Sequence, residues 1–251
     1  MSGIASETVL AAFLVFCRIG SCLLMAPGLS STRIPSQVRL FLAVGISLAL
    51  TPVLLPEVMP AVGNGNPATL FAAIVAEAAT GLMIGFLARI FFMALQTMAV
   101  AIAQSIGLGG MFGGIPDDTD QLPGAAVLFT MTATAMIFAS DQHWELLRGL
   151  VDSYQVLPPG ADFSPRLSLV SIADQLSGTF ILALRIASPF LIYSVIVNLA
   201  VGITNKLTPQ IPVFFIAMPF VTAGGLLLLF FTIKEVLTVF SNAFGDWLVA
   251  G

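Results

Sequence analysis

The sequence predicts an all-α integral membrane protein made of long, kinked helices and helical hairpins. Hydrophobic residues make up 58% of its 251 residues and charged residues only 9%, whereas soluble proteins average about 45–50% and about 25%. Several apolar runs approach or exceed the ~20 residues that a helix needs to cross a bilayer. Acidic residues outnumber basic residues by 13 to 9. The chain therefore has no excess positive charge for binding a nucleic acid.

The first half of the chain contains three apolar runs. The run at about residues 8–25 predicts a helix that is retained, because no Lys or Arg precedes it as in a cleaved signal peptide. The run at about 38–55 predicts a helix that ends at Pro52 and Pro56. The run at 68–106 is longer than one span requires, and it predicts either one long bent helix or two helices that meet partway.

The second half of the chain predicts a short helix and then a long hairpin. The short helix is expected over about residues 124–139. Apolar runs at 176–204 and 213–240 predict the two helices of the hairpin. We expect Pro219 and the glycine pair Gly224-Gly225 to interrupt the second of these helices, because both residue types disfavour a helix interior.

The chain carries no recognisable catalytic or metal-binding motif. Its one histidine, His143, stands beside Trp144 in a polar stretch at 140–177, a pairing more typical of an anchor at the membrane interface than of a catalyst. Cys17 and Cys22 lie five residues apart within one apolar run, without a second pair of ligands. We therefore expect no enzymatic activity, no bound metal and no cofactor.

A glycine-rich segment between the two halves is the most distinctive stretch of the chain. Five of the ten residues at 107–116 are glycine, and four of the others are apolar, whereas a solvated turn would be polar. The segment lacks the spacing of a phosphate-binding loop. We expect a loop that closes a passage, with a plain flexible linker as the alternative. The expected plug residues are Gly107, Gly109, Gly110, Met111, Phe112, Gly113, Gly114, Ile115 and Pro116.

The acidic side chains that follow this segment are Asp117, Asp118 and Asp120. Three carboxylates so close together could form a cation ring or a calcium site. A solvated, acidic exit from the loop is the favoured interpretation.

Four charged residues lie inside apolar runs: Arg18, Glu77, Arg89 and Arg185. A charge at the centre of a membrane helix costs roughly 2.5–3.5 kcal/mol, so four of them facing lipid would cost about 10–14 kcal/mol. We therefore expect these side chains to face protein or a water-filled path. Glu77 and Arg89 are twelve residues apart, roughly 18 Å along a helix, so they do not pair with each other. Ion pairs with partner subunits are favoured over a proton relay.

Two further features concern the assembly of helices. Gly81 and Gly85 are four residues apart, a spacing that lets a neighbouring helix come close. Lys206, in the connection between the last two long helices, joins the charged residues that we expect to take part in assembly.

Four segments of the chain carry a recognisable pattern. The most specific segment is residues 198–219, with the core Asn-Lys-Leu-Thr-Pro-Gln-Ile-Pro-Val-Phe-Phe. The others are 18–39, which includes Ile34-Pro35-Ser36-Gln37-Val38-Arg39, then 81–89 and 104–112. Together, and spread over nearly the whole chain, these segments resemble the FliR/SpaR/YscT/SctT family of type III secretion export-gate proteins, and within it the flagellar FliR members.

The resemblance implies a non-enzymatic subunit of the bacterial inner-membrane export gate in the flagellar basal body. It implies that residues 1–175 are FliP-like in fold and that residues 176–251 form a FliQ-like hairpin. The implied partners are FliP and FliQ, together with FlhB and FlhA, and the implied substrates are unfolded secreted proteins. The segment at 107–116 corresponds to the family's plug loop, although it is richer in glycine here and has Pro116-Asp117 in place of the frequent Asp-Pro order.

Three other functions stay open at this point. A polytopic secondary transporter would use Glu77 and Arg89 near the middle of the membrane, and inverted repeats would support it. An assembly scaffold would have no part in gating. An equivalent subunit of a virulence injectisome would share the family's fold.

Overall fold

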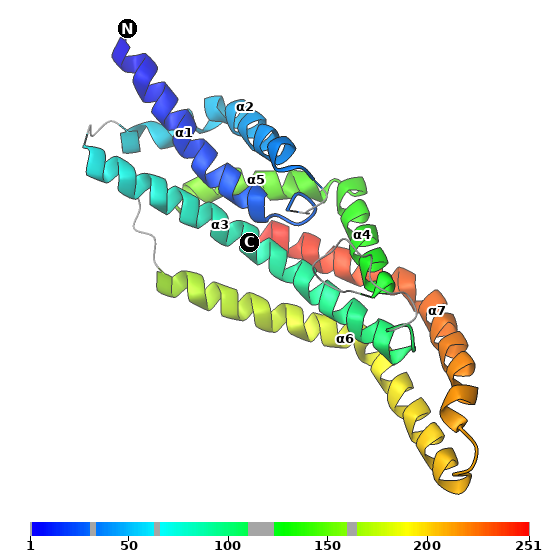
Figure 1. Cartoon of the computed structure of the whole chain (residues 1–251). Helices are drawn as coiled ribbons and strands as arrows, with labels where there is room; N and C mark the ends of the chain where they lie inside the picture. The colour runs from blue at the N-terminus through cyan, green and yellow to red at the C-terminus, as the bar shows by residue number, and fades with distance from the viewer. Residues whose placement is uncertain (1, 31–33, 63–65, 110–122, 160–164, 251) are drawn as a thin grey trace. The chain divides into compact units, whose positions relative to one another are not determined.

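The computed structural model describes residues 2–30, 34–62, 66–109, 123–159 and 165–250, and these ranges contain seven helices and no strand (Figure 1). Five helices are long and apolar enough to cross a membrane. The prediction of an all-α protein with several possible spans is therefore confirmed. The two helices on either side of Ser140 and Asp141 are bent relative to each other. They add a sixth possible span only if they are counted together as one.

The chain forms two compact units, each assembled from segments that are distant in sequence. Unit 1 consists of Met1–Phe91, Asp141–Leu176 and Trp247–Gly251. Unit 2 consists of Phe92–Ser140 and Ser177–Asp246. The predicted division at residue 175, which concerns likeness to FliP and FliQ, stays a prediction.

Unit 1 contains α1 (Ser2–Met25), α2 (Ser36–Val62), α5 (Gln142–Val156) and the first part of α3 (Pro67–Ser105). Its core is formed by apolar side chains that recur every three or four residues along α1 and meet α2. These buried residues include Leu14, Val15, Ile19 and Leu23 of α1, Ala43, Leu54 and Val58 of α2, Ala73 of α3 and Tyr154 of α5.

The expectation that the second helix ends at Pro52 and Pro56 is wrong, because α2 continues through both prolines and Pro60 to Val62. The three prolines are four residues apart and all are exposed, whereas Leu54 and Val58 are buried. Their rings therefore disturb one side of the helix and leave its packed side continuous. Prolines inside a helix are also better tolerated in membrane proteins than in soluble ones.

Unit 2 contains the rest of α3, α4 (Gly124–Ala139), and most of α6 (Pro165–Leu207) and α7 (Val213–Ala250). Figure 1 shows α6 and α7 joined by a short turn, as the sequence predicts for a hairpin. The ring of Phe92 meets those of Phe240 and Phe244 edge to face, with ring centroids 5.6 and 5.9 Å apart. This aromatic cluster joins α3 to α7 within unit 2.

The expected interruptions of the last helix are also wrong, because α7 runs unbroken through Pro219, Gly224 and Gly225. A Cβ atom at Gly225 would overlap the Ile106 side chain, and one at Gly224 would lie 2.6 Å from the Tyr193 hydroxyl oxygen. The two glycines therefore allow close packing against α7 and do not mark a break.

Candidate functional site

The centre of unit 1 is a buried ion pair between α1 and α3. Arg18 Nε donates a hydrogen bond to Glu77 Oε2 and Arg18 Nη2 donates one to Glu77 Oε1, each over 2.8 Å. Both side chains are 1% exposed. The two parallel hydrogen bonds form the fork geometry in which arginine binds a carboxylate most strongly.

Helix α5 completes the surroundings of this pair. Arg18 Nη1 donates to Ser153 Oγ over 3.1 Å, and Arg18 Nη2 donates to the Leu157 carbonyl oxygen over 2.8 Å. The guanidinium carbon also lies 3.9 Å from the centre of the Tyr154 ring, within the range of a cation–π contact. Arg18 thus connects α1, α3 and the C-terminal end of α5.

The structure gives Arg18 and Glu77 a partner within the chain, so neither needs a second subunit to balance its charge. The contribution of α5 to this cluster was not predicted from the sequence. The signal was present, because Leu147, Leu150, Val151 and Tyr154 follow helical spacing. These residues form the packed side of α5, and Arg148 and Asp152 are exposed on its other side.

Gly81 and Gly85 lie where α1 packs closely against α3. A Cβ atom at Gly81 would overlap the Arg18 carbonyl oxygen and Ser21 Oγ, and one at Gly85 would lie 2.8 Å from Met25 Cβ. Because the Gly81 obstacle includes backbone, a side chain there would force the two helices apart. This contact lies within about one helical turn of Glu77, so it also sets the distance over which Arg18 reaches the carboxylate.

Replacing Gly81 with alanine is therefore expected to destabilise unit 1 by about 1–3 kcal/mol through overpacking. Gly45 is the matched control, because it lies inside α2 and a Cβ atom added there would have no neighbouring atom within 4 Å. Gly45→Ala is expected to be neutral or to stabilise by up to about 1 kcal/mol. The thermal aggregation temperatures of the purified proteins in detergent measure both effects. Equal temperatures for the two variants would contradict the close approach.

The remaining predicted charges are placed differently, because Arg89, Arg185 and Lys206 are exposed. Arg89 lies on α3 and Arg185 on α6, both within the candidate membrane spans. Among the described residues, no carboxylate forms an ion pair with either arginine. A transporter site built from Glu77 and Arg89 is disfavoured, because the Glu77 carboxylate is bound to Arg18.

A broad apolar surface covers the hairpin in unit 2. Large apolar side chains are exposed along both α6 and α7, where a soluble protein would present polar groups. They include Val195, Leu199, Phe215, Phe220, Phe230 and Phe231, each at least 63% exposed. Such a surface requires lipid or other apolar helices around it.

The end of α3 leads into the predicted plug segment through a defined cap. Gly107 has a φ angle of 79°; its N–H donates to the Gln104 carbonyl oxygen, and the Leu108 N–H donates to the Ala103 carbonyl oxygen over 2.8 Å. This is the Schellman arrangement, which favours glycine at the left-handed position. Leu108 is buried, so the segment starts from a fixed point.

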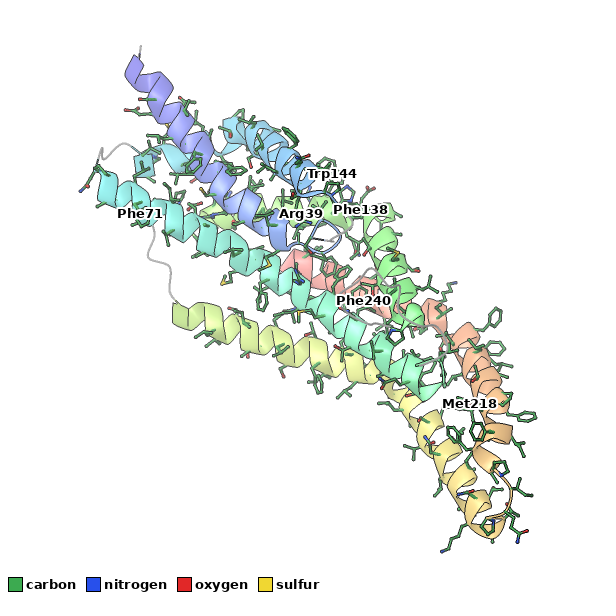
Figure 2. The ribbon with its side chains drawn as sticks, in the orientation of Figure 1. Arg39, Phe71, Phe138, Trp144, Met218 and Phe240 are labelled. Carbon is green, nitrogen blue, oxygen red and sulfur yellow. The ribbon has the colours of Figure 1, made fainter. Side chains whose placement is uncertain are left out.

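Most of the predicted plug lies outside the described residues, namely Gly110, Met111, Phe112, Gly113, Gly114, Ile115 and Pro116. Asp117, Asp118 and Asp120 also lie outside them. Beside Gly107, unit 2 has a cavity of about 150 Å³ that is lined by Gln104, Asn198, Phe214 and Met218, among others. Figure 2 labels Met218 near the start of α7.

Within the described ranges, no group of His, Cys, Asp and Glu side chains is arranged to hold a metal ion. His143 lies against Trp144, with ring centroids 5.5 Å apart, and the Trp144 side chain is 62% exposed.

Comparison with known proteins decides the family. The sequence model of the bacterial export proteins, family 1, matches residues 9–247. The chain belongs to this family. The resemblance predicted from the four sequence segments is thereby confirmed.

Curated relatives match over nearly their full length. The flagellar biosynthetic protein FliR of Caulobacter vibrioides is 27% identical over 243 residues, which cover 96% of this chain and 95% of the relative. FliR of Aquifex aeolicus is 28% identical, covering 98% and 95%. The Yop proteins translocation protein T of Yersinia pestis is 29% identical, covering 90% and 87%. These names are consistent with a membrane protein of an export apparatus. Such a protein also fits the expected lack of enzymatic activity.

Proposed function

We propose that this chain is a non-enzymatic subunit of the flagellar type III protein export gate. In this proposal it forms a pore with FliP and FliQ, through which unfolded flagellar proteins are secreted. The observation that carries the proposal is the match to the export family over residues 9–247, together with full-length similarity to FliR proteins. The bacterial inner membrane at the flagellar basal body is the corresponding location.

Exposed groups in the two units support a role inside an assembly. Arg89 and Arg185 are exposed within apolar helices, and the α6–α7 hairpin presents large apolar side chains on its surface. An arginine facing lipid costs a few kcal/mol, so neighbouring subunits that provide countercharges would stabilise both sites. We assign Arg89, Arg185 and Lys206 to contacts with partner subunits, and the Arg18–Glu77 pair with Gly81 and Gly85 to the fold that presents them.

The proposed organisation follows the family resemblance. Residues 1–175 would take the place of a FliP-like subunit, and residues 176–251 would take that of a FliQ-like hairpin. FlhB and FlhA are the further partners of this gate. Residues 107–116 would form its plug, with Met111, Phe112 and Ile115 as the sealing side chains and the glycines as the points that let them move.

Deletion of the gene in its own host tests the proposal directly. The deletion is expected to stop secretion of flagellar proteins into the medium and to remove flagella, and the wild-type gene on a plasmid is expected to restore both. The empty plasmid in the same deletion strain is the control. Unchanged secretion of flagellar proteins in the deletion strain would contradict the proposal.

An injectisome subunit is the second candidate, favoured by the 29% identity to the Yop proteins translocation protein T. The same deletion strain separates the two candidates. Loss of secreted effector proteins with intact flagella would assign the chain to an injectisome, whereas loss of flagella with intact effector secretion would assign it to the flagellum.

A further inference from the structure

One face of α3 in unit 1 combines apolar side chains with an exposed arginine. Val75, Leu82 and Arg89 follow one another at steps of seven residues, and Phe71 lies four residues before Val75. Since seven residues make almost two helical turns, the four side chains lie on one side of the helix. We call these four residues the Arg89 face.

The Arg89 face is open in the single chain. The side chains of Phe71, Val75 and Leu82 are 68%, 52% and 41% exposed, and Arg89 is exposed as well. Figure 2 labels Phe71 near the start of α3. The face therefore offers a strip of apolar surface that ends at a guanidinium group.

The countercharge for Arg89 does not come from the carboxylate on the same helix. Glu77 lies twelve residues before Arg89 on α3, about 120° around the helix from it. Both of its carboxylate oxygens accept hydrogen bonds from Arg18. By contrast, Arg18, which the fold encloses, donates hydrogen bonds to a carboxylate, a hydroxyl group and a carbonyl oxygen.

We propose that the Arg89 face binds an apolar helix of a partner subunit, and that this helix carries an Asp or Glu side chain level with Arg89. Charge complementarity carries the choice of partner, because a carboxylate in an apolar surrounding accepts two parallel hydrogen bonds from a guanidinium group. The seven-residue steps suit a neighbouring helix that packs along the strip as in a coiled coil. This inference rests on the proposed function only in requiring a partner subunit.

The competing ligand for Arg89 is the phosphate of a lipid headgroup. Arginine binds phosphate with the same fork geometry, and its long side chain reaches towards the membrane surface. A phosphate, however, would leave Phe71, Val75 and Leu82 facing acyl chains and would give no role to their alignment with Arg89. We therefore favour the acidic helix and treat the lipid as an outcome of the test.

Charge variants of Arg89 test the inference in the assembled complex. Arg89→Glu is expected to lower recovery of the partner subunits with the tagged protein at least about tenfold, and Arg89→Lys is expected to retain most of it. Arg148→Glu is the matched control, because Arg148 is an exposed arginine of the same unit that lies outside the Arg89 face. Recovery should return when the acidic residue of the partner helix is changed to Arg. Wild-type recovery with Arg89→Glu would overturn the inference.

A photo-crosslinking amino acid at Leu82 keeps the test decisive if Arg89→Glu prevents stable folding. In the otherwise wild-type complex, irradiation is expected to join Leu82 to a helix of another subunit that has Asp or Glu about two turns away, level with Arg89. Adducts with lipid alone, or with a helix that has no carboxylate at that level, would overturn the inference.

The two proposals fail in different ways. If the wild-type protein copurifies with other subunits but Leu82 contacts only lipid, the inference about the Arg89 face is wrong and the proposed function stands. If the wild-type protein copurifies with no other subunit, the proposed function itself fails, and the inference fails with it.

Discussion

Replacing Glu77 with alanine is expected to destabilise unit 1 by about 3–5 kcal/mol, because it leaves the guanidinium of Arg18 buried without its countercharge. Ser153 and the Leu157 carbonyl would remain as neutral acceptors, which do not balance a positive charge. The aggregation temperature in detergent is expected to fall by roughly 6–20 °C. Helices α1, α3 and α5 should separate together, because Arg18 connects all three.

The control for this variant is Glu145→Ala. Glu145 pairs with Arg148 over 3.3 Å on the surface of α5, and such exposed pairs contribute only about 0–1 kcal/mol. The double variant Arg18→Leu/Glu77→Leu is expected to recover much of the lost stability, since it removes both charges at once. A Glu77→Ala protein as stable as Glu145→Ala would contradict the role assigned to the buried pair.

Deleting residues 109–114 is expected to make the membrane leak ions when the complex is assembled. A gate that is open about 1% of the time is held shut by only about 2.7 kcal/mol, so loss of the plug would raise ion flux up to about a hundredfold. Ion flux across vesicles that contain the purified complex measures the change. The cap at Gly107 and Leu108 is retained in this deletion, so α3 keeps its normal end.

Two further variants separate sealing from loop length. Changing Met111, Phe112 and Ile115 to serine keeps the glycines and the length, and it is expected to produce a similar leak if apolar side chains form the seal. Changing Asp117, Asp118 and Asp120 to asparagine is expected to leave the flux unchanged. An unaltered flux in both the deletion and the serine variant would leave residues 107–116 as a plain linker.

The sequence was sufficient to predict the fold class, because membrane helices are long apolar runs whose composition is unmistakable. It also predicted that Arg18 and Glu77 avoid lipid. It did not predict that they bind each other, because they are 59 residues apart and only the packing of α1 on α3 brings them together. The contribution of α5 depends on the same packing.

Local rules failed where packing overrides them. Prolines at 52 and 56 predicted a helix end, yet they lie on the exposed side of α2, where their rings leave the packed side intact. Gly224 and Gly225 predicted an interruption, yet the side chains of Tyr193 and Ile106 pack closely against them. In both cases the packing of the helix decides whether the residue ends it.

The most direct test of the central claim is the native mass and subunit composition of the tagged protein, extracted from its host membrane in mild detergent. Membership in an export gate predicts one large complex that contains several copies of FliP and FliQ. A stable monomer or simple dimer, free of other subunits, would contradict the claim.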